Sequence, residues 1–440
     1  MKFDEILTNY LGDFGAYQRK IYVLVCLPAI WCSMNMFCWT FTGADIPHRC
    51  KLDADDVDFH AHRNTTYQMN NNETDPQLQK CSRIHVATGE WQGCVDGYVF
   101  DNSEKAASAV QDWELVCDQR WVAACVQSLF YLGIFFGSLT LGYLADKVGR
   151  KLVILVGSFL ITCLSIACVL SPNIIVFALF RFAHGFLEPA LWQQEESAAA
   201  ADEGSKKTRT YGYMDLIRSP NMRRKTLVCC YCWTIVTLIY YGISLNPSAI
   251  AGDFYVSFIL TGFVEVPALI LLLLLLNKLG RKFLQSGGFM LCGLAFFIIV
   301  LVPAEFEPIT LILVLISKSA VTAAFCVIYL HTSEIFPTVV RGIALGLTVT
   351  CSRIGGIMSP IASMFLTDTY RGAVLTAFGA FAVVAALVTL TLPETTNKKL
   401  PETLEDGENF GKEMTLWGSA KKRNMETSKN PEEDLKMVKS

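Results

Sequence analysis

Ten long apolar stretches, separated by short polar segments, dominate the pattern of hydrophobic and polar positions along the chain. Each is about 20 residues long, which is the length that an α-helix needs to cross roughly 30 Å of hydrocarbon. The pattern therefore predicts ten transmembrane helices, at residues 21–43, 121–145, 152–171, 173–192, 226–246, 252–277, 283–303, 309–330, 342–366 and 373–393.

The composition agrees with a membrane protein built only from helices. Hydrophobic residues make up 52% of the 440 positions and charged residues 18%, which is too apolar for a set of ordinary soluble domains. The first 20 residues carry Asp4, Glu5 and Asp13 and lack a basic start and a small-residue cleavage site. They are therefore not interpreted as a signal peptide, and the first apolar stretch is expected to remain as a helix.

The basic residues of the short loops predict the orientation. They gather in the loops after the second, fourth, sixth and eighth stretches, whereas the opposite short loops hold only Arg371. By the positive-inside rule, residues 1–20, 193–225 and 394–440 are cytosolic, and residues 44–120 form one large extracellular loop. The tail at 394–440 is charged from Asn397 onward and poor in apolar residues, so we expect it to be disordered.

The extracellular loop carries an even number of cysteines, at Cys50, Cys81, Cys94 and Cys117. In an oxidising compartment this predicts two disulfides, with three possible connectivities. The same loop holds two glycosylation sequons, at Asn64 and Asn72.

A basic turn follows the second predicted helix, in the stretch GYLADKVGRK, and a shorter echo, NKLGRK, follows the sixth. The first stretch resembles the loop motif of the major facilitator superfamily, whose matching positions here are Gly142, Asp146, Gly149 and Arg150. Arg181, four residues before Gly185, resembles the R-x-x-x-G motif in the fourth helix of that superfamily. An echo in the second half is expected of a transporter fold built from internal repeats.

Four further stretches resemble the organic cation, carnitine and organic anion transporter family, solute carrier family 22. They are DWELVCDQRW, YYGISLNPSAIAGDFY, HTSEIFPTVVRG and LPETTNKKLPET. The resemblance implies a major facilitator-type helical bundle that transports small organic ions across the plasma membrane by alternating access. Sugar carriers share the terminal P-E-T pattern but place paired glutamines that are absent here, so a sugar substrate is a lesser alternative.

The same resemblance implies that part of the family's structure is absent. Members have twelve helices, and the stretch between Gly185 and LIRSPNMRRKT is too short here for the fifth and sixth helices and the P-E-S-P-R-like segment after them. Residues 121–192 then supply only three helices beside the first, at 21–43, and residues 226–393 supply a complete six-helix bundle. A chain with such a deficit has a second interpretation, that of a variant that cannot transport.

Three predicted helices place an ionisable residue near the middle of the membrane: Glu265, Lys318 and Arg353. Such residues are costly in a bilayer and therefore indicate a cavity, although an ion pair that only holds helices together is the alternative. By resemblance, Arg353 occupies the position where anion and carnitine carriers have an arginine. Two cations and one carboxylate favour a substrate with a carboxylate.

Three aromatic residues of the fifth predicted helix, Trp233, Tyr240 and Tyr241, are candidates to bind an organic ammonium group, although packing is the alternative for them. Glu334 and Arg341 flank Pro337 at the cytosolic end of the eighth helix and are candidates for a gating pair. No nucleotide, metal or catalytic motif occurs, so neither enzyme activity nor a cofactor is predicted. The predicted partners are the lipid bilayer and a small organic ion, not nucleic acid, and no pattern indicates an oligomeric state.

Overall fold

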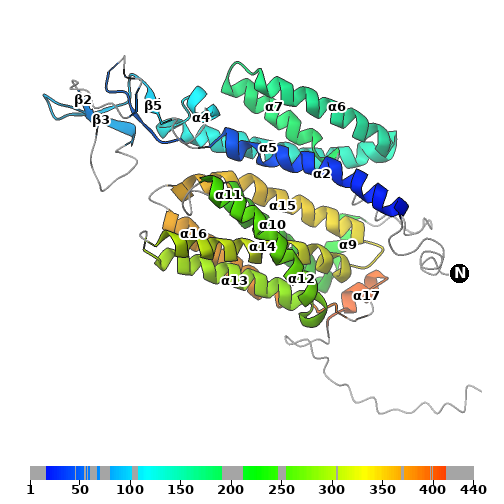
Figure 1. Cartoon of the computed structure of the whole chain (residues 1–440). Helices are drawn as coiled ribbons and strands as arrows, with labels where there is room; N and C mark the ends of the chain where they lie inside the picture. The colour runs from blue at the N-terminus through cyan, green and yellow to red at the C-terminus, as the bar shows by residue number, and fades with distance from the viewer. Residues whose placement is uncertain are drawn as a thin grey trace, which may run out of the picture.

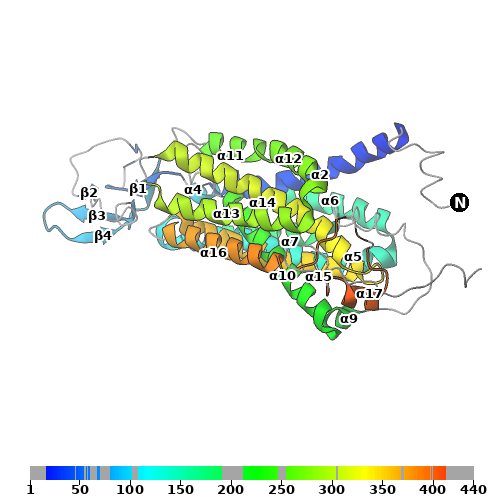
Figure 2. The ribbon, with the colours of Figure 1, turned by 90° about the horizontal axis from the view of Figure 1, so that it is seen from below.

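The structure is a computed structural model of the 440-residue chain. It describes residues 16–44, 46–53, 56, 58–59, 67–69, 80–101, 108–190, 212–245, 254–303, 306–367, 371–396, 398 and 400–412. Two groups of long helices lie side by side, with short strands at one end and two short helices at the other (Figure 1). The view from below shows the same separation of the two ends (Figure 2).

The first group contains four helices and the elements that lead into them. Its long helices are α2 (Ala16–Thr42), α5 (Arg120–Val148), α6 (Arg150–Val169) and α7 (Ile174–Leu187), and the short α4 (Ala109–Asp112) and η2 (Cys117–Gln119) precede α5. The second group contains α10 (Pro220–Leu245), α11 (Phe254–Phe263), α12 (Glu265–Leu279), α13 (Arg281–Leu301), α14 (Glu307–Ile335), α15 (Arg341–Met364), η3 (Phe365–Thr367) and α16 (Arg371–Thr389).

Each of the ten predicted transmembrane stretches coincides with a helix or, at 252–277, with the pair α11 and α12. Within the described residues, eight spans are long and apolar enough to cross a membrane, and α7 is a shorter apolar helix. The predicted cytosolic junction at 193–225 needs a correction, because α9 (Tyr213–Arg218) lies within it and α10 already begins at Pro220. Proline is favoured in the first turn of a helix, which explains the earlier start.

The expected disorder of the tail is wrong for residues 404–409, which form α17 (Leu404–Asn409). Thr403 and Asp406 form a capping box that starts this helix. Its carbonyl end is held by Lys225, whose Nζ donates to the oxygens of Gly407 at 2.8 Å and Phe410 at 2.7 Å. The Glu408 carboxylate in turn accepts from backbone amides at the start of α10, so α17 and α10 cap each other.

Glycines set the crossing of α5 and α7. A Cβ added at Gly133 or Gly137 of α5 would collide with the backbone of α7, and one at Gly185 of α7 would collide with the backbone of α5. Small residues four apart let helices approach closely in this way. Gly142, the first glycine of the loop motif, is exposed on α5, so the crossing lies more than one turn closer to the start of this helix.

The second group has one continuous core, formed by α10, α13, α14, α15 and α16. Trp233, Phe289 and Phe296 are among its fully buried members. Helix pairs make close contacts here too: a Cβ at Gly355 of α15 would collide with the backbone of α10 at Thr234. The core therefore fixes the faces of α10 and α15 that carry the candidate site.

The described residues of the loop predicted at 44–120 fold into two small antiparallel sheets. Strands β1 (His48–Cys50) and β5 (Tyr98–Phe100) pair in one, and β2 (Tyr67–Met69), β3 (Ser82–His85) and β4 (Trp91–Gly93) form the other. The four predicted cysteines form the bonds Cys50–Cys94 and Cys81–Cys117, which selects one of the three connectivities. The second bond ties β3 to the entrance of α5. Asn64 and Asn72 lie outside the described residues.

Candidate functional site

An ion pair inside the second helix group forms the core of the candidate site. Lys318 of α14 is 2% exposed, and its Nζ lies 3.0 Å from Oε1 of Glu265. The same Nζ donates to Oγ of Ser244 at 2.5 Å and lies 3.3 Å from the ring centroid of Tyr240. The ammonium group therefore has a carboxylate, a hydroxyl and an aromatic face around it, which together offset the cost of burying its charge.

Glu265 lies near the middle of the sixth predicted span, where α11 ends at Phe263 and α12 begins at Glu265. Val264 between them keeps a helical backbone, its amide donates to the Leu260 oxygen, and its oxygen accepts from the Ala268 amide, so the helical path continues. Pro267 cannot donate a backbone hydrogen bond, which weakens the helix here.

The aromatic residues of α10 have two different environments. Trp233 is fully buried, donates from Nε1 to Oγ1 of Thr332 at 3.1 Å and packs edge-on against Tyr329. This environment favours the packing role that the sequence left open for it. Tyr240 instead belongs to the charged cluster, since its hydroxyl donates to Oε1 of Glu265 at 2.9 Å.

Tyr241 and Arg353 lie at the seam between the two helix groups. The Tyr241 ring lies 5.1 Å from that of Tyr131 on α5, which is the opposite group. Arg353 of α15 is 7% exposed and close enough to Tyr241 to interact with it electrostatically. One turn further along α15, Gly356 is covered by the Tyr131 ring.

The structure therefore brings Glu265 and Lys318 into direct contact, whereas Arg353 lies on α15 at the seam. Tyr240, which contacts the Glu265–Lys318 pair, and Tyr241, which lies at the seam, have rings 5.3 Å apart. Glu265, Lys318 and Arg353 do not line the cavity that lies on the seam. The expectation that all three charges line one common pocket stays a prediction.

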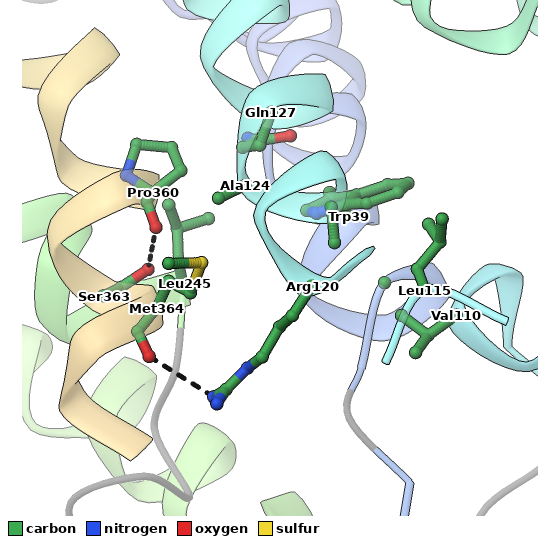
Figure 3. A pocket seen from close by; sticks show the side chains of 12 residues that line it. Trp39, Val110, Leu115, Arg120, Ala124, Gln127, Leu245, Pro360, Ser363 and Met364 are labelled. Carbon is green, nitrogen blue, oxygen red and sulfur yellow. Dashed lines mark hydrogen bonds between the residues drawn. The ribbon is translucent and has the colours of Figure 1, made fainter. Parts of the chain in front are cut away.

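A small cavity of ≈ 80 Å³ lies on the seam between the two helix groups (Figure 3). Residues from both helix groups line it, among them Trp39, Arg120 and Gln127 from one side and Leu245, Pro360 and Met364 from the other. Arg120 closes it by donating from Nη2 to the Met364 oxygen at 3.3 Å. Sequence reasoning did not single out Arg120 or Gln127, and the only available signal was that Arg120 is part of DWELVCDQRW.

At the end of the helices far from the strands, Glu334 is bound by Arg281. The guanidinium Nε of Arg281 lies 3.2 Å from Oε2 of Glu334, which also accepts from Oγ1 of Thr395 at 2.5 Å. These contacts join α13, the end of α14 and the segment Pro393–Thr396 after α16, all within the second group. The predicted pair of Glu334 with Arg341 stays a prediction.

The two GRK turns have similar backbones. Gly149 and Gly280 both have positive φ, 105° and 85°, and each directly precedes a helix, α6 and α13. A residue with a side chain would be strained there. The side chains of Asp146 and Arg150 lie outside the described part of the structure.

Only the second turn has a carboxylate cap among the described residues. Glu394 accepts from the backbone amides of Arg281 at 3.0 Å and Lys282 at 3.1 Å, and from Oγ1 of Thr396 at 2.8 Å. Burial by itself raises the pKa of Glu394, but these hydrogen bonds outweigh it and lower the pKa below the usual value. Around Gly149, no described atom lies within 4 Å of where a Cβ would be.

Arg181 lies in the first helix group, 4% exposed and away from the charged cluster. Its Nη2 donates to Oε1 of Gln127 at 3.0 Å, and its guanidinium lies 4.3 Å from the ring centroid of Phe130. The fourth-helix motif thus joins α7 to α5.

Comparison with known proteins identifies transporter relatives along the chain. Residues 191–406 match the family "Sugar (and other) transporter", and residues 119–201 match the "Major Facilitator Superfamily". The organic cation transporter protein of Drosophila melanogaster is 28% identical over 533 aligned positions, covering 94% of this chain and 95% of the relative. Organic cation/carnitine transporter 2 of Homo sapiens is 27% identical over 522 positions, covering 92% and 93%.

Among solved structures, a D-xylose-proton symporter aligns with a TM-score of 0.48 and 15% identity, covering 63% of this chain and 89% of that one.

Proposed function

Because the chain belongs to the major facilitator superfamily and, within it, to solute carrier family 22, we propose that it carries small organic ions across the plasma membrane by alternating access. The observation that carries this proposal is the Lys318–Glu265 pair near the middle of two predicted spans, in which the side chain of Lys318 is 2% exposed and that of Glu265 is 25% exposed. A polar cluster of this kind is expensive in a membrane and is expected where a substrate passes.

The contacts across the seam support an arrangement that is closed toward the extracellular loop. Ser128 donates to the Ile357 oxygen at 2.9 Å, Arg120 to that of Met364, and Tyr131 contacts Tyr241. These contacts lie in the outer half of α5 and the outer part of α15. Alternating access then requires that they open while the cytosolic ends approach.

The substrate charge is proposed from the position and the resemblance of Arg353. Glu265 neutralises Lys318, and Arg353 is a buried cation at the seam, close enough to Glu188 for the two charges to interact. Because Arg353 resembles the arginine of anion and carnitine carriers, we expect it to bind the carboxylate of an organic anion or of a zwitterion such as carnitine. Tyr240 offers its ring to Lys318, which leaves Tyr241 and Tyr131 as the aromatic surface nearest the seam.

The proposal is tested by uptake into cells that display the chain at their surface. Labelled carnitine, tetraethylammonium and an aromatic carboxylate are compared with mock cells and with cells that express Lys318→Met at the same surface level. Saturable uptake of at least one compound that is lost in Lys318→Met supports the proposal. Surface expression without any uptake contradicts it.

A second candidate function is a transport-incompetent variant of such a carrier. The alignment with the Drosophila relative runs over 533 positions, more than the 440 residues of this chain, so parts of the relative have no counterpart here. Alternating access needs two bundles that move against each other, and among the described residues the first group has four long helices. Comparing uptake with a chimera that carries the fifth and sixth helices of a relative separates the two: uptake by the chimera alone favours this candidate.

We also propose cytosolic termini and an extracellular loop at 44–120. Its two disulfides support this side, because such bonds persist in oxidising compartments. Tags at either end should be detected only after permeabilisation, and Asn64→Gln with Asn72→Gln should remove any glycan. A tag that antibodies reach in intact cells would reverse the orientation.

A further inference from the structure

The cavity on the seam carries one charged side chain, and the transport proposal gives this charge no role in binding. Of the twelve described residues that line the cavity, Arg120 is the only ionisable one (Figure 3). Arg120 is only partly buried, whereas Arg353 is 7% exposed. The Arg120 guanidinium therefore keeps accessible surface at the end of the helices near the strands.

Arg120 crosses the seam from the start of one helix to the end of another. It is the first residue of α5, and its Nη2 donates to the oxygen of Met364, the last residue of α15, at 3.3 Å. The carbonyl groups at the end of a helix lack helical partners and carry partial negative charge, so a cation is favoured there. Arg120 thus connects the two helix groups as a charged cap of α15.

This cap is the outermost of three contacts between α5 and α15. Two turns further along α5, Ser128 donates to the Ile357 oxygen at 2.9 Å, and the Tyr131 ring covers Gly356. The bond from Arg120 is longer than the 2.9 to 3.0 Å that is usual for such bonds, and its acceptor is neutral. Among these three contacts, it is the one that a solute arriving at this end meets first and replaces most easily.

A carboxylate is a better partner for Arg120 than the Met364 oxygen. It accepts two parallel hydrogen bonds from a guanidinium, each between opposite charges. The cavity, at ≈ 80 Å³, is well below the roughly 300 Å³ of pockets that enclose a whole small molecule. It therefore admits only the carboxylate end of an organic ion while the seam is closed.

We propose that Arg120 is an entry site for substrates with a carboxylate, and that the carboxylate replaces the Met364 oxygen on the guanidinium and so releases α15 from the start of α5. This inference rests on the proposed function, because it assumes that the seam opens during transport. Arg353 lies 11 residues before Met364 on α15, about 16 Å deeper at 1.5 Å rise per residue. The two cations therefore act in sequence, Arg120 at entry and Arg353 within the seam.

The test measures opening of the seam in the purified full chain, held in lipid nanodiscs. The reporter is Ser363→Cys, because Ser363 lines the cavity and is 3% exposed. A cationic methanethiosulfonate modifies this cysteine, and peptide mass spectrometry separates it from the native cysteines. We expect carnitine and butyrate to raise the rate of modification at least about threefold, because a ligand shifts an equilibrium toward the state that it binds better.

Neutral butyramide has nearly the shape of butyrate without its charge, and it should leave the rate of modification unchanged. A rate that butyrate leaves unchanged or lowers, or that butyramide raises equally, overturns the proposal.

Two variants and a control assign the response to Arg120. In the reporter chain, Arg120→Gln should raise the rate without ligand, because the charged cap is lost, and should abolish the response to butyrate. Arg120→Lys keeps a cation and should keep a weaker response, since lysine binds a carboxylate only as a point charge. Arg371→Gln is the matched control, because Arg371 begins α16 at the same end of the helices without lining the cavity.

The Arg371→Gln chain should respond to butyrate as the reporter chain does. A response retained in Arg120→Gln, or lost equally in Arg371→Gln, overturns the proposal. Modification does not require transport, so the two proposals fail separately. A response without uptake contradicts only the proposed function, and uptake without a response contradicts only the role of Arg120.

Discussion

The two helix groups differ in how their buried residues are connected. In the second group, 31 buried hydrophobic residues form one cluster. In the first group, the described buried residues fall into separate clusters of two to four, and a further cluster joins α5 to α10 across the seam. The second group thus has one continuous core, whereas the described part of the first group has several small ones.

The two GRK turns show the same difference at one position each. Glu394 caps the turn at Gly280, and the described residues offer no such cap near Gly149. The proposal that this chain lacks the family's fifth and sixth helices and the P-E-S-P-R-like segment after them predicts such a contrast.

The largest expected effect is in the second group, at its ion pair. Lys318→Met leaves Glu265, whose side chain is 25% exposed, without its cation, so we expect a cost near the lower end of the roughly 3 to 5 kcal/mol of a fully buried pair. We expect a strongly lowered Tm in detergent. Adding Glu265→Gln removes the stranded charge and should restore most of the loss; a double variant as unstable as Lys318→Met would show that the two residues are not energetically coupled.

The next effect concerns the crossing that holds the smaller group together. Gly137→Leu should cost about 1 to 3 kcal/mol or prevent folding, because its side chain collides with the α7 backbone. Gly142→Leu is the matched control on the same helix, and as an exposed position it should stay near the parent in thermal unfolding. Equal effects of both changes would contradict the crossing geometry.

A smaller effect is expected at the Glu394 cap, together with a dependence on pH. Glu394→Gln should cost about 1 kcal/mol through the weakened cap of α13. Since the pKa of Glu394 is lower in the folded state, its contribution is present above the unfolded pKa and is lost as pH falls through the folded pKa. The difference in Tm between parent and variant should therefore shrink in the acid range; a difference that grows there would have the wrong sign.

The smallest effect is expected from the buried indole. Trp233→Phe removes the bond to Thr332 and should cost about 1 kcal/mol in stability, with an unchanged order of substrate preference. A changed order of substrate preference would indicate that Trp233 contacts the substrate and would contradict a packing role.

Sequence reasoning located the helices and the buried charges because both depend on local pattern and on the cost of charge in a bilayer. It paired Glu334 with Arg341, which are close in the chain, whereas the contact with Arg281 joins residues 53 apart. It likewise missed Ser244 beside Lys318, because a serine in a span carries no signal until the partner helix is placed. The Thr403-x-x-Asp406 box of α17 was readable but was outweighed by the charged composition of the tail.

The central claim, that Arg353 sets the substrate charge at the seam, is tested most directly by the ratio of carnitine to tetraethylammonium uptake in proteoliposomes. Arg353→Asp should lower this ratio by at least about tenfold relative to Arg353→Lys, because the sign of the charge at the seam is reversed. An unchanged ratio in Arg353→Asp, with transport preserved, would contradict the account.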